Sequence, residues 1–74
     1  MSSKKNLKDK IILITGAGDG MGRAAAIEYA SQGASVILLG RNVKNLEKTH
    51  DIIISENSPS PMISLMDLSK ADGN

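Results

Sequence analysis

The 74-residue sequence contains no cysteine, tryptophan or phenylalanine, and it has a single tyrosine and a single histidine. Without cysteine there can be no disulfide or thiolate metal site, and one histidine is too few for a structural zinc site. An aromatic share of 1% leaves no stacking platform for single-stranded nucleic acid. A net charge of +1 gives no broad field for DNA or an anionic membrane. We therefore expect no metal, nucleic acid or membrane among its partners.

Long apolar runs are also missing. The first ten residues carry four lysines, and the apolar run that follows, Ile11 to Ile14, is too short for a signal peptide or a membrane span. Ser2 follows Met1, so the N-myristoylation signal is absent. These absences predict a cytoplasmic protein in which residues 1–9 form a polar leader. A chain of this length forms at most one small domain, which buries only about 60% of its unfolded surface.

The rest of the chain alternates between strand and helix patterns. The apolar run at residues 10–15 lacks the alternation of a half-exposed strand, which is typical of parallel strands covered on both faces, and residues 35–39 form a second run of this type. The expected strands are residues 10–15, 35–39 and 62–68.

Two helices are expected between these strands. Good helix formers occupy residues 21–32, and Gly33 follows, a residue that commonly ends a helix in the left-handed conformation. Asn42 can cap a second helix over residues 43–55. The two prolines within residues 56–61 stop that helix.

The second helix has apolar residues at helical spacing, which predicts one buried face made by Val43, Leu46, Ile53 and Ile54. His50 lies among them without a paired carboxylate or a second histidine at ligand spacing. We therefore expect His50 to be a surface or half-buried helix residue with no metal-binding role.

The predicted order is β-α-β-α-β. Crossovers between parallel strands are almost always right-handed, so both helices should lie on one face of a three-stranded parallel sheet. This arrangement is one mononucleotide-binding half of a doubly wound, Rossmann-type α/β fold. Residues 10–74 are accordingly expected to form part of a larger dinucleotide-binding domain.

Between the first strand and the first helix lies TGAGDGMG, residues 15–22, with four glycines in eight residues. Glycines in a strand–turn–helix segment allow a tight reversal and let a ligand phosphate approach backbone amides that a Cβ would block. The following helix offers unpaired N–H groups and the positive end of its dipole. The segment therefore predicts a phosphate-binding turn rather than merely a flexible loop.

Other nucleotide motifs fit this turn less well. A Walker loop requires lysine and then serine or threonine after its last glycine, but Arg23 and Ala24 stand there. The G-x-G-x-x-G pattern fails because Met21 occupies the place of the third glycine. The spacing that fits is Thr-Gly-x-x-x-Gly-x-Gly.

That spacing resembles the cofactor fingerprint of the short-chain dehydrogenase/reductase family, and the resemblance extends from about residue 10 to residue 68. It implies that Gly16 lets the turn pass beneath the adenosine half of the cofactor. Gly20 and the backbone N–H of Met21 would meet the pyrophosphate. Gly22 would allow close packing of the helix on the first strand, and Thr15 would stabilise the turn.

The resemblance carries further implications. Asp67, with the backbone of Leu68, would lie against the adenine, and the full-length form would be a homo-oligomer. The chemistry of that family resembles general acid–base catalysis by the tyrosine of a Tyr-x-x-x-Lys motif. Here the only tyrosine, Tyr29, is followed four residues later by Gly33, so no catalytic residue is assigned and Tyr29 is expected to be a packing residue.

The end of the second strand indicates which dinucleotide is bound. An Asp or Glu there commonly holds the ribose hydroxyls of NAD, but this chain has Gly40 followed by the permanent cation Arg41. We therefore predict NADP(H) rather than NAD(H). Asp19 opposes this prediction, because NADP-preferring relatives often carry a basic residue before the middle glycine. An S-adenosylmethionine site would also require an acid where Gly40 stands.

A second hypothesis remains open: a stand-alone nucleotide-binding or interaction module without catalysis. Such a module would need a partner or a second copy to cover its sheet. In the family the first strand is central, so in this chain Ile11 to Ile14 would form an exposed apolar edge. We also expect the sheet face opposite the helices to be bare, as in a fragment of a longer reductase.

Overall fold

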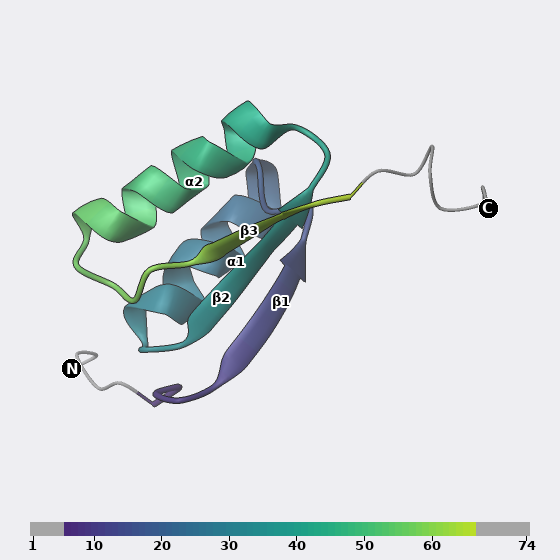
Figure 1. Cartoon of the computed structure of the whole chain (residues 1–74). Coiled ribbons are helices and arrows are strands. Elements are labelled where there is room, and N and C mark those ends of the chain that lie inside the picture. The colour runs from purple at the N-terminus through teal and green to yellow at the C-terminus, as the bar shows by residue number, and fades with distance from the viewer. Residues whose placement is uncertain (1–5, 67–74) are drawn as a thin grey trace.

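A computed structural model of the chain describes residues 6–66, in which two helices pack on a three-stranded sheet (Figure 1). The predicted β-α-β-α-β order is confirmed, and the bounds of the first four elements lie within one residue of those expected. The third strand ends earlier than expected, and Asp67 and Leu68 lie outside the described residues. The elements are β1 (Ile11–Thr15), α1 (Gly20–Ser31), β2 (Ser35–Gly40), α2 (Val43–Ser55) and β3 (Met62–Leu65).

The strands are parallel and lie in the order β1-β2-β3, with Ile12 opposite Val36 and Leu38 opposite Ile63. Both helices cover the same face of this sheet, as predicted, and they also contact each other (Figure 1). All three strands therefore end at one edge, which is where open α/β sheets bind ligands.

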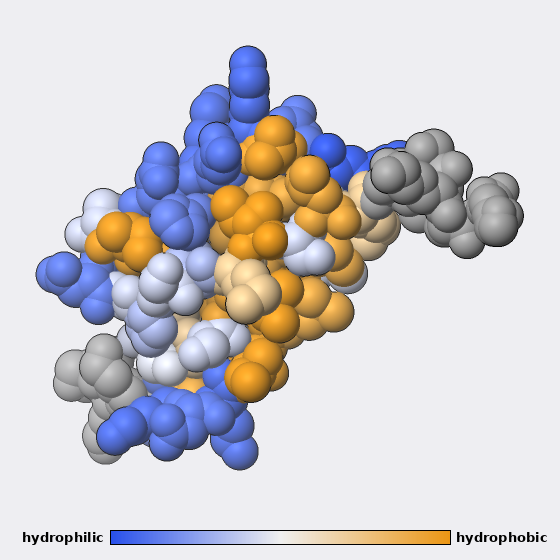
Figure 2. Space-filling view, in the orientation of Figure 1, coloured by the Kyte–Doolittle hydropathy of each residue, from blue (hydrophilic) through white to orange (hydrophobic). Residues whose placement is uncertain are grey.

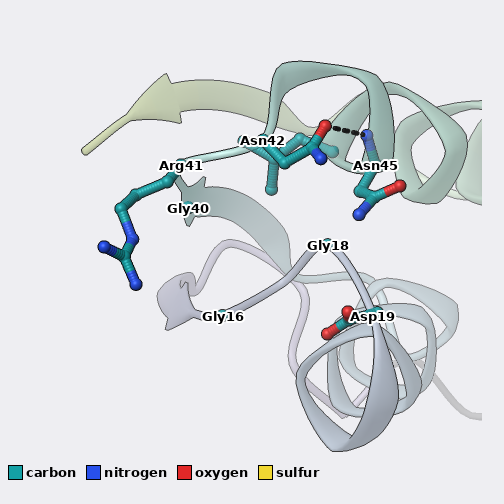
Figure 3. Close-up of a pocket in the computed structure, with 8 residues that line it drawn as sticks. Gly16, Gly18, Asp19, Gly40, Arg41, Asn42 and Asn45 are labelled. Carbon is teal, nitrogen blue, oxygen red and sulfur yellow. Dashed lines mark hydrogen bonds between the residues drawn. The ribbon is translucent and has the colours of Figure 1, made fainter. Parts of the chain in front are cut away.

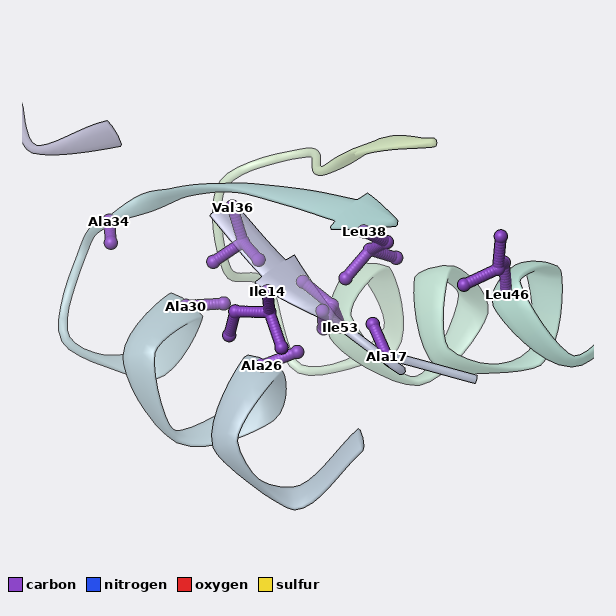
Figure 4. Close-up of a cluster of buried hydrophobic side chains, with 9 residues drawn as sticks. All are labelled: Ile14, Ala17, Ala26, Ala30, Ala34, Val36, Leu38, Leu46 and Ile53. Atoms are coloured by element: carbon purple, nitrogen blue, oxygen red, sulfur yellow. The ribbon is translucent and has the colours of Figure 1, made fainter. Parts of the chain in front are cut away.

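The core lies between the helices and the covered face of the sheet. Ala26 and Ala30, one helical turn apart on α1, are fully buried. Their small side chains let α1 lie close to Ile14 and Val36 (Figure 4). Ile53 of α2 completes the cluster, so both helices are attached to one continuous core.

The buried face of α2 differs from the predicted one. Leu46, Thr49 and Ile53 are fully buried, whereas Val43 and Ile54 are each 41% exposed, so their predicted burial was wrong. The reason is helical geometry, since each residue turns the helix by about 100°. Val43 and Ile54 lie about 60–80° to one side of the Leu46–Ile53 line, and Thr49 lies on the other side.

His50 is half-buried on α2, as predicted. The expectation that it has no carboxylate partner was wrong, because its Nδ1 lies 3.3 Å from Oδ1 of Asp51. Asp51 is the next residue along the helix and its side chain is 82% exposed. The contact is therefore a local surface pair, which contributes little to stability.

The ends of the helices follow the sequence signals. Gly33, which follows the C-cap residue Gln32 of α1, has φ of 99°, the left-handed conformation expected of it. Asn42 caps α2, because its Oδ1 accepts a hydrogen bond from the N–H of Asn45 at 3.1 Å. Ahead of β1, the N–H of Leu7 donates to the carbonyl of Gln32 at 2.9 Å. Leu7 is therefore attached to the end of α1.

The other face of the sheet carries apolar side chains that no described element covers. Ile11, Leu13 and Met62 are 74%, 56% and 64% exposed. Figure 2 shows apolar residues gathered over the strands on this side. β1 lies at the edge of the described sheet, as expected, but only Ile11 and Leu13 of its apolar residues are exposed, because Ile14 is buried beneath the helices. Within residues 6–66, neither helix has the length and hydropathy needed to cross a membrane.

Candidate functional site

A pocket of about 240 Å³ lies at the carboxyl edge of the sheet, where the glycine turn faces the loop after β2 (Figure 3). It is formed by segments that are far apart in the sequence and that the parallel topology brings together. Its lining residues are Gly16, Gly18, Asp19, Gly40, Arg41, Asn42, Asn45 and Leu46.

Two glycines of the turn are required by the backbone conformation. Gly16 has φ of +66° and Gly20 has φ of +55°, values that residues other than glycine rarely adopt. A Cβ at either position would meet no heavy atom within 4 Å. These two glycines therefore shape the turn and leave open space beside it.

The other two glycines are required because atoms approach them closely. A Cβ at Gly18 would lie 2.9 Å from the Cβ of Asn45. A Cβ at Gly22 would collide with the carbonyl oxygen of Gly16 and lie 3.1 Å from that of Thr15. Gly22 thus lets α1 begin directly against the end of β1. Gly18 was missed as a site residue because its neighbour Asn45 belongs to α2, far along the sequence from the turn.

The N-terminus of α1 has unpaired donors. Asp19 is the N-cap residue, with an extended backbone, but its side chain makes no capping hydrogen bond. The first N–H groups of a helix have no intrahelical partner, and those of Gly20 and Met21 are among them. With the helix dipole, such donors favour an anion. The turn and the open space beside Gly16 and Gly20 therefore fit a phosphate group.

The opposite wall of the pocket comes from the end of β2. A Cβ at Gly40 would lie 3.2 Å from Cδ2 of Leu46, so the chain passes close to α2 there. Arg41 is exposed and extends on the opposite side of the pocket from Asp19 (Figure 3). The only ion pair within residues 6–66 joins His50 and Asp51, so Asp19 does not neutralise Arg41.

Sequence reasoning missed several residues around this pocket. Asn45 was not singled out, yet it lines the pocket beside Gly18. Arg23 and Thr49 lie behind the turn, where they hydrogen-bond its backbone. The burial of Thr49 could have been found from its helical spacing to Leu46 and Ile53, but its partner in the turn is 32 residues away.

Three other residues were considered from the sequence: Tyr29, Asp67 and Leu68. Tyr29 lies on α1, 38% exposed, and it does not line the pocket. The assignment of Asp67 and Leu68 to an adenine site concerns residues outside the described part of the chain. The described residues contain no cluster of three or more histidine, aspartate or glutamate side chains that could hold a metal ion.

The fold defines a class: three parallel strands, two crossover helices on one face and a glycine turn after β1 form one half of a doubly wound α/β domain. Residues 10–73 match the family model described as short chain dehydrogenase. The chain belongs to the short-chain dehydrogenase family. It is 50% identical over 62 residues to the uncharacterized oxidoreductase YciK of Escherichia coli strain K12, covering 84% of this chain and 25% of the relative.

Solved structures agree with this membership. A protein of Shigella flexneri 2a strain 301, complexed with NADP, superposes with a TM-score of 0.83 at 48% identity and covers 88% of this chain and 27% of its own. A protein of Escherichia coli CFT073, complexed with NADPH, has a TM-score of 0.81 at 48% identity and covers 88% and 28%. The chain thus spans about a quarter of the length of the relatives that it matches.

Proposed function

We propose that this chain is the NADP(H)-binding part of a short-chain oxidoreductase, which moves a hydride between the nicotinamide and a carbonyl or alcohol substrate. One observation carries the proposal: a single pocket joins a helix N-terminus without a side-chain cap to an arginine at the end of β2 that forms no ion pair with any residue from 6 to 66. The relatives complexed with NADP and NADPH, each 48% identical, support it.

The glycine turn would bind the pyrophosphate. The N–H groups of Gly20 and Met21 would donate to its oxygens, because they lie in the first turn of α1 and need partners. Gly16 would let the adenosine half pass over the turn, where no side chain fills the space. Gly22 supports this site by keeping α1 against β1.

Arg41 would bind the 2′-phosphate. Its guanidinium is a permanent cation with a planar fork suited to phosphate oxygens. Gly40 supplies no carboxylate to repel that phosphate, and Asp19, the one acid among the described residues that line the pocket, lies across it (Figure 3). The separation of Asp19 from Arg41 (Figure 3) supports this role for Arg41, because an acid across the pocket repels the 2′-phosphate less than one beside it. Asp67 and Leu68 remain proposed for the adenine.

The segment itself would supply no catalytic acid or base. When bound, the dinucleotide provides the hydride chemistry, and the described residues hold and orient its phosphates. Tyr29 is unsuited to catalysis because it lies on α1, away from the residues that line the pocket. The catalytic groups, substrate contacts and any assembly of the whole enzyme would come from residues other than these.

Replacing Arg41 tests the proposal. We expect Arg41→Ala to raise the dissociation constant for NADPH by about tenfold or more, because hydrogen bonds to charged groups contribute about 1.5–3 kcal/mol. The constant for NADH should change little, since NADH has no 2′-phosphate. Both can be measured by the change in nicotinamide fluorescence on titration.

Lys44→Ala is the matched control, because it removes one positive charge from a neighbouring exposed residue that does not line the pocket. It should leave both constants nearly unchanged. Equal losses for NADPH and NADH in Arg41→Ala would remove the phosphate role of Arg41. Failure of the unchanged chain to bind either dinucleotide would refute the proposed function.

A further inference from the structure

A small polar network joins the back of the glycine turn to α2. Thr49 Oγ1 donates to the carbonyl of Ala17 at 2.8 Å and accepts from Nε of Arg23 at 2.9 Å. Arg23 Nη2 donates to the carbonyl of Gly18 at 2.5 Å and lies 3.4 Å from that of Asn45. We call these contacts the Arg23–Thr49 network.

Thr49 is the one fully buried polar side chain among residues 6–66. Its single hydroxyl hydrogen can serve one acceptor at a time, and the carbonyl of Ala17 at 2.8 Å is nearer than that of Asn45 at 3.3 Å. Burial of a hydroxyl is unfavourable unless it is hydrogen-bonded. The hydroxyl of Thr49 is therefore explained by its hydrogen bond to the turn, and packing alone would not require it.

The position of Arg23 is electrostatically unfavourable. It lies in the first turn of α1, where the helix dipole disfavours a positive charge. Its guanidinium is partly buried and bonds Thr49 and the backbone of the turn. Those contacts offset the unfavourable position, because charge-assisted hydrogen bonds are about twice as strong as neutral ones.

The network determines which backbone groups of the turn can face an anion. In a trans peptide the carbonyl of one residue and the N–H of the next point in opposite directions. Holding the carbonyl of Ala17 on Thr49 therefore turns the N–H of Gly18 away from α2. Holding the carbonyl of Gly18 on Arg23 turns the N–H of Asp19 away in the same manner.

We propose that Arg23 and Thr49 are positioning residues, which hold the glycine turn in its anion-binding shape before the dinucleotide binds. This inference rests on the proposed function. The carbonyls of Ala17 and Gly18, which would repel a phosphate, are held by hydrogen bonds to Thr49 and Arg23. The N–H groups that follow them in the chain therefore point in the opposite direction. Since pyrophosphate is common to NADPH and NADH, the network serves both equally, unlike Arg41.

Paired variants of the full chain separate this role from general packing. Thr49→Val keeps the shape of the side chain and removes the hydroxyl, whereas Thr49→Ser keeps the hydroxyl. Arg23→Lys keeps the positive charge and loses the planar fork that reaches several acceptors. The dissociation constants for NADPH and NADH and the amide hydrogen exchange of residues 16–22 without cofactor are measured for each.

We expect Thr49→Val and Arg23→Lys to raise both dissociation constants by about tenfold, the loss of one hydrogen bond to a charged or buried partner. Exchange within residues 16–22 should speed up in both variants, while Thr49→Ser should restore the affinity and the protection. If Thr49→Val does not fold, as judged by circular dichroism, the positioning role is tested by comparing Arg23→Lys with the unchanged chain.

Unchanged affinity and unchanged exchange in the folded variants would overturn the positioning role while leaving the proposed function intact. A loss with Arg23→Lys confined to NADPH would also overturn it, because the network would then act on the 2′-phosphate. By contrast, failure of the unchanged chain to bind either dinucleotide refutes the function itself.

Discussion

The two faces of the sheet carry similar residues in opposite surroundings. On one face Val36 and Leu38 are 1% and 0% exposed beneath the helices, and on the other Ile11 and Leu13 are 74% and 56% exposed. Continuous apolar strands of this kind are typical of parallel sheets with both faces covered. The strands therefore carry the pattern of a two-sided core, and the described elements cover one side of it.

This difference shows what the covered face depends on. α1 approaches the sheet through small residues, Ala26 and Ala30, and its Gly22 packs directly against the end of β1. α2 is attached through Leu46 and Ile53 and capped by Asn42. The uncovered face has no such partners among residues 6–66. The same substitution should accordingly have unequal effects on the two sides.

The largest effect is expected from truncating leucine on each face. Leu38→Ala should lower the free energy of unfolding by about 2–5 kcal/mol, because it leaves a cavity under both helices. Leu13→Ala should lower it by less than about 1 kcal/mol, since Leu13 is already 56% exposed. Denaturant unfolding followed by circular dichroism measures both. Equal losses would mean that the second face is covered in solution.

A smaller loss of stability is expected when a substitution pushes α1 away from the covered face of the sheet. Gly22→Ala should lower the free energy of unfolding by about 3 kcal/mol, the upper part of the range for overpacking, because the obstacle is backbone. Gly20→Ala is the control, since its Cβ meets nothing and only the left-handed conformation costs about 1–2 kcal/mol. If the two variants unfold at the same denaturant concentration, the close approach at Gly22 is unimportant.

The smallest effect is expected at the start of α2. Asn42→Ala removes the cap on the N–H of Asn45 and should cost about 1 kcal/mol. Asn42→Asp keeps an acceptor and should stay close to the unchanged chain. The midpoint of unfolding provides the readout, and a stable alanine variant would show that the cap contributes nothing to holding α2 on the sheet.

Local signals in the sequence predicted most of the fold. Apolar runs, Gly33 and Asn42 act on their immediate neighbours, so their effects on strands and helix ends could be anticipated without a structure. The spacing of the turn glycines likewise pointed to the edge of the sheet where the pocket lies. The predicted buried face of α2 was partly wrong, because Val43 and Ile54 lie to one side of the face that is buried.

The rest of the site depends on contacts between distant segments. Thr49 and the carbonyl of Ala17 are 32 residues apart, and Arg23 and Thr49 are 26 apart. No periodicity links such pairs, and a threonine within a helix carries no local mark of its partner. The crowding of Gly18 by Asn45 has the same origin. Three-dimensional contact was needed to find these residues.

The hydrogen bond from Leu7 to Gln32 has a practical consequence for anyone handling this chain. Leu7 precedes β1 and Gln32 follows α1, so this bond lies at the amino ends of the strands. The glycine turn and Arg41 lie at the carboxyl ends. A chain anchored to a sensor chip ahead of Leu7 would therefore present the pocket between the glycine turn and Arg41 toward the flowing solution.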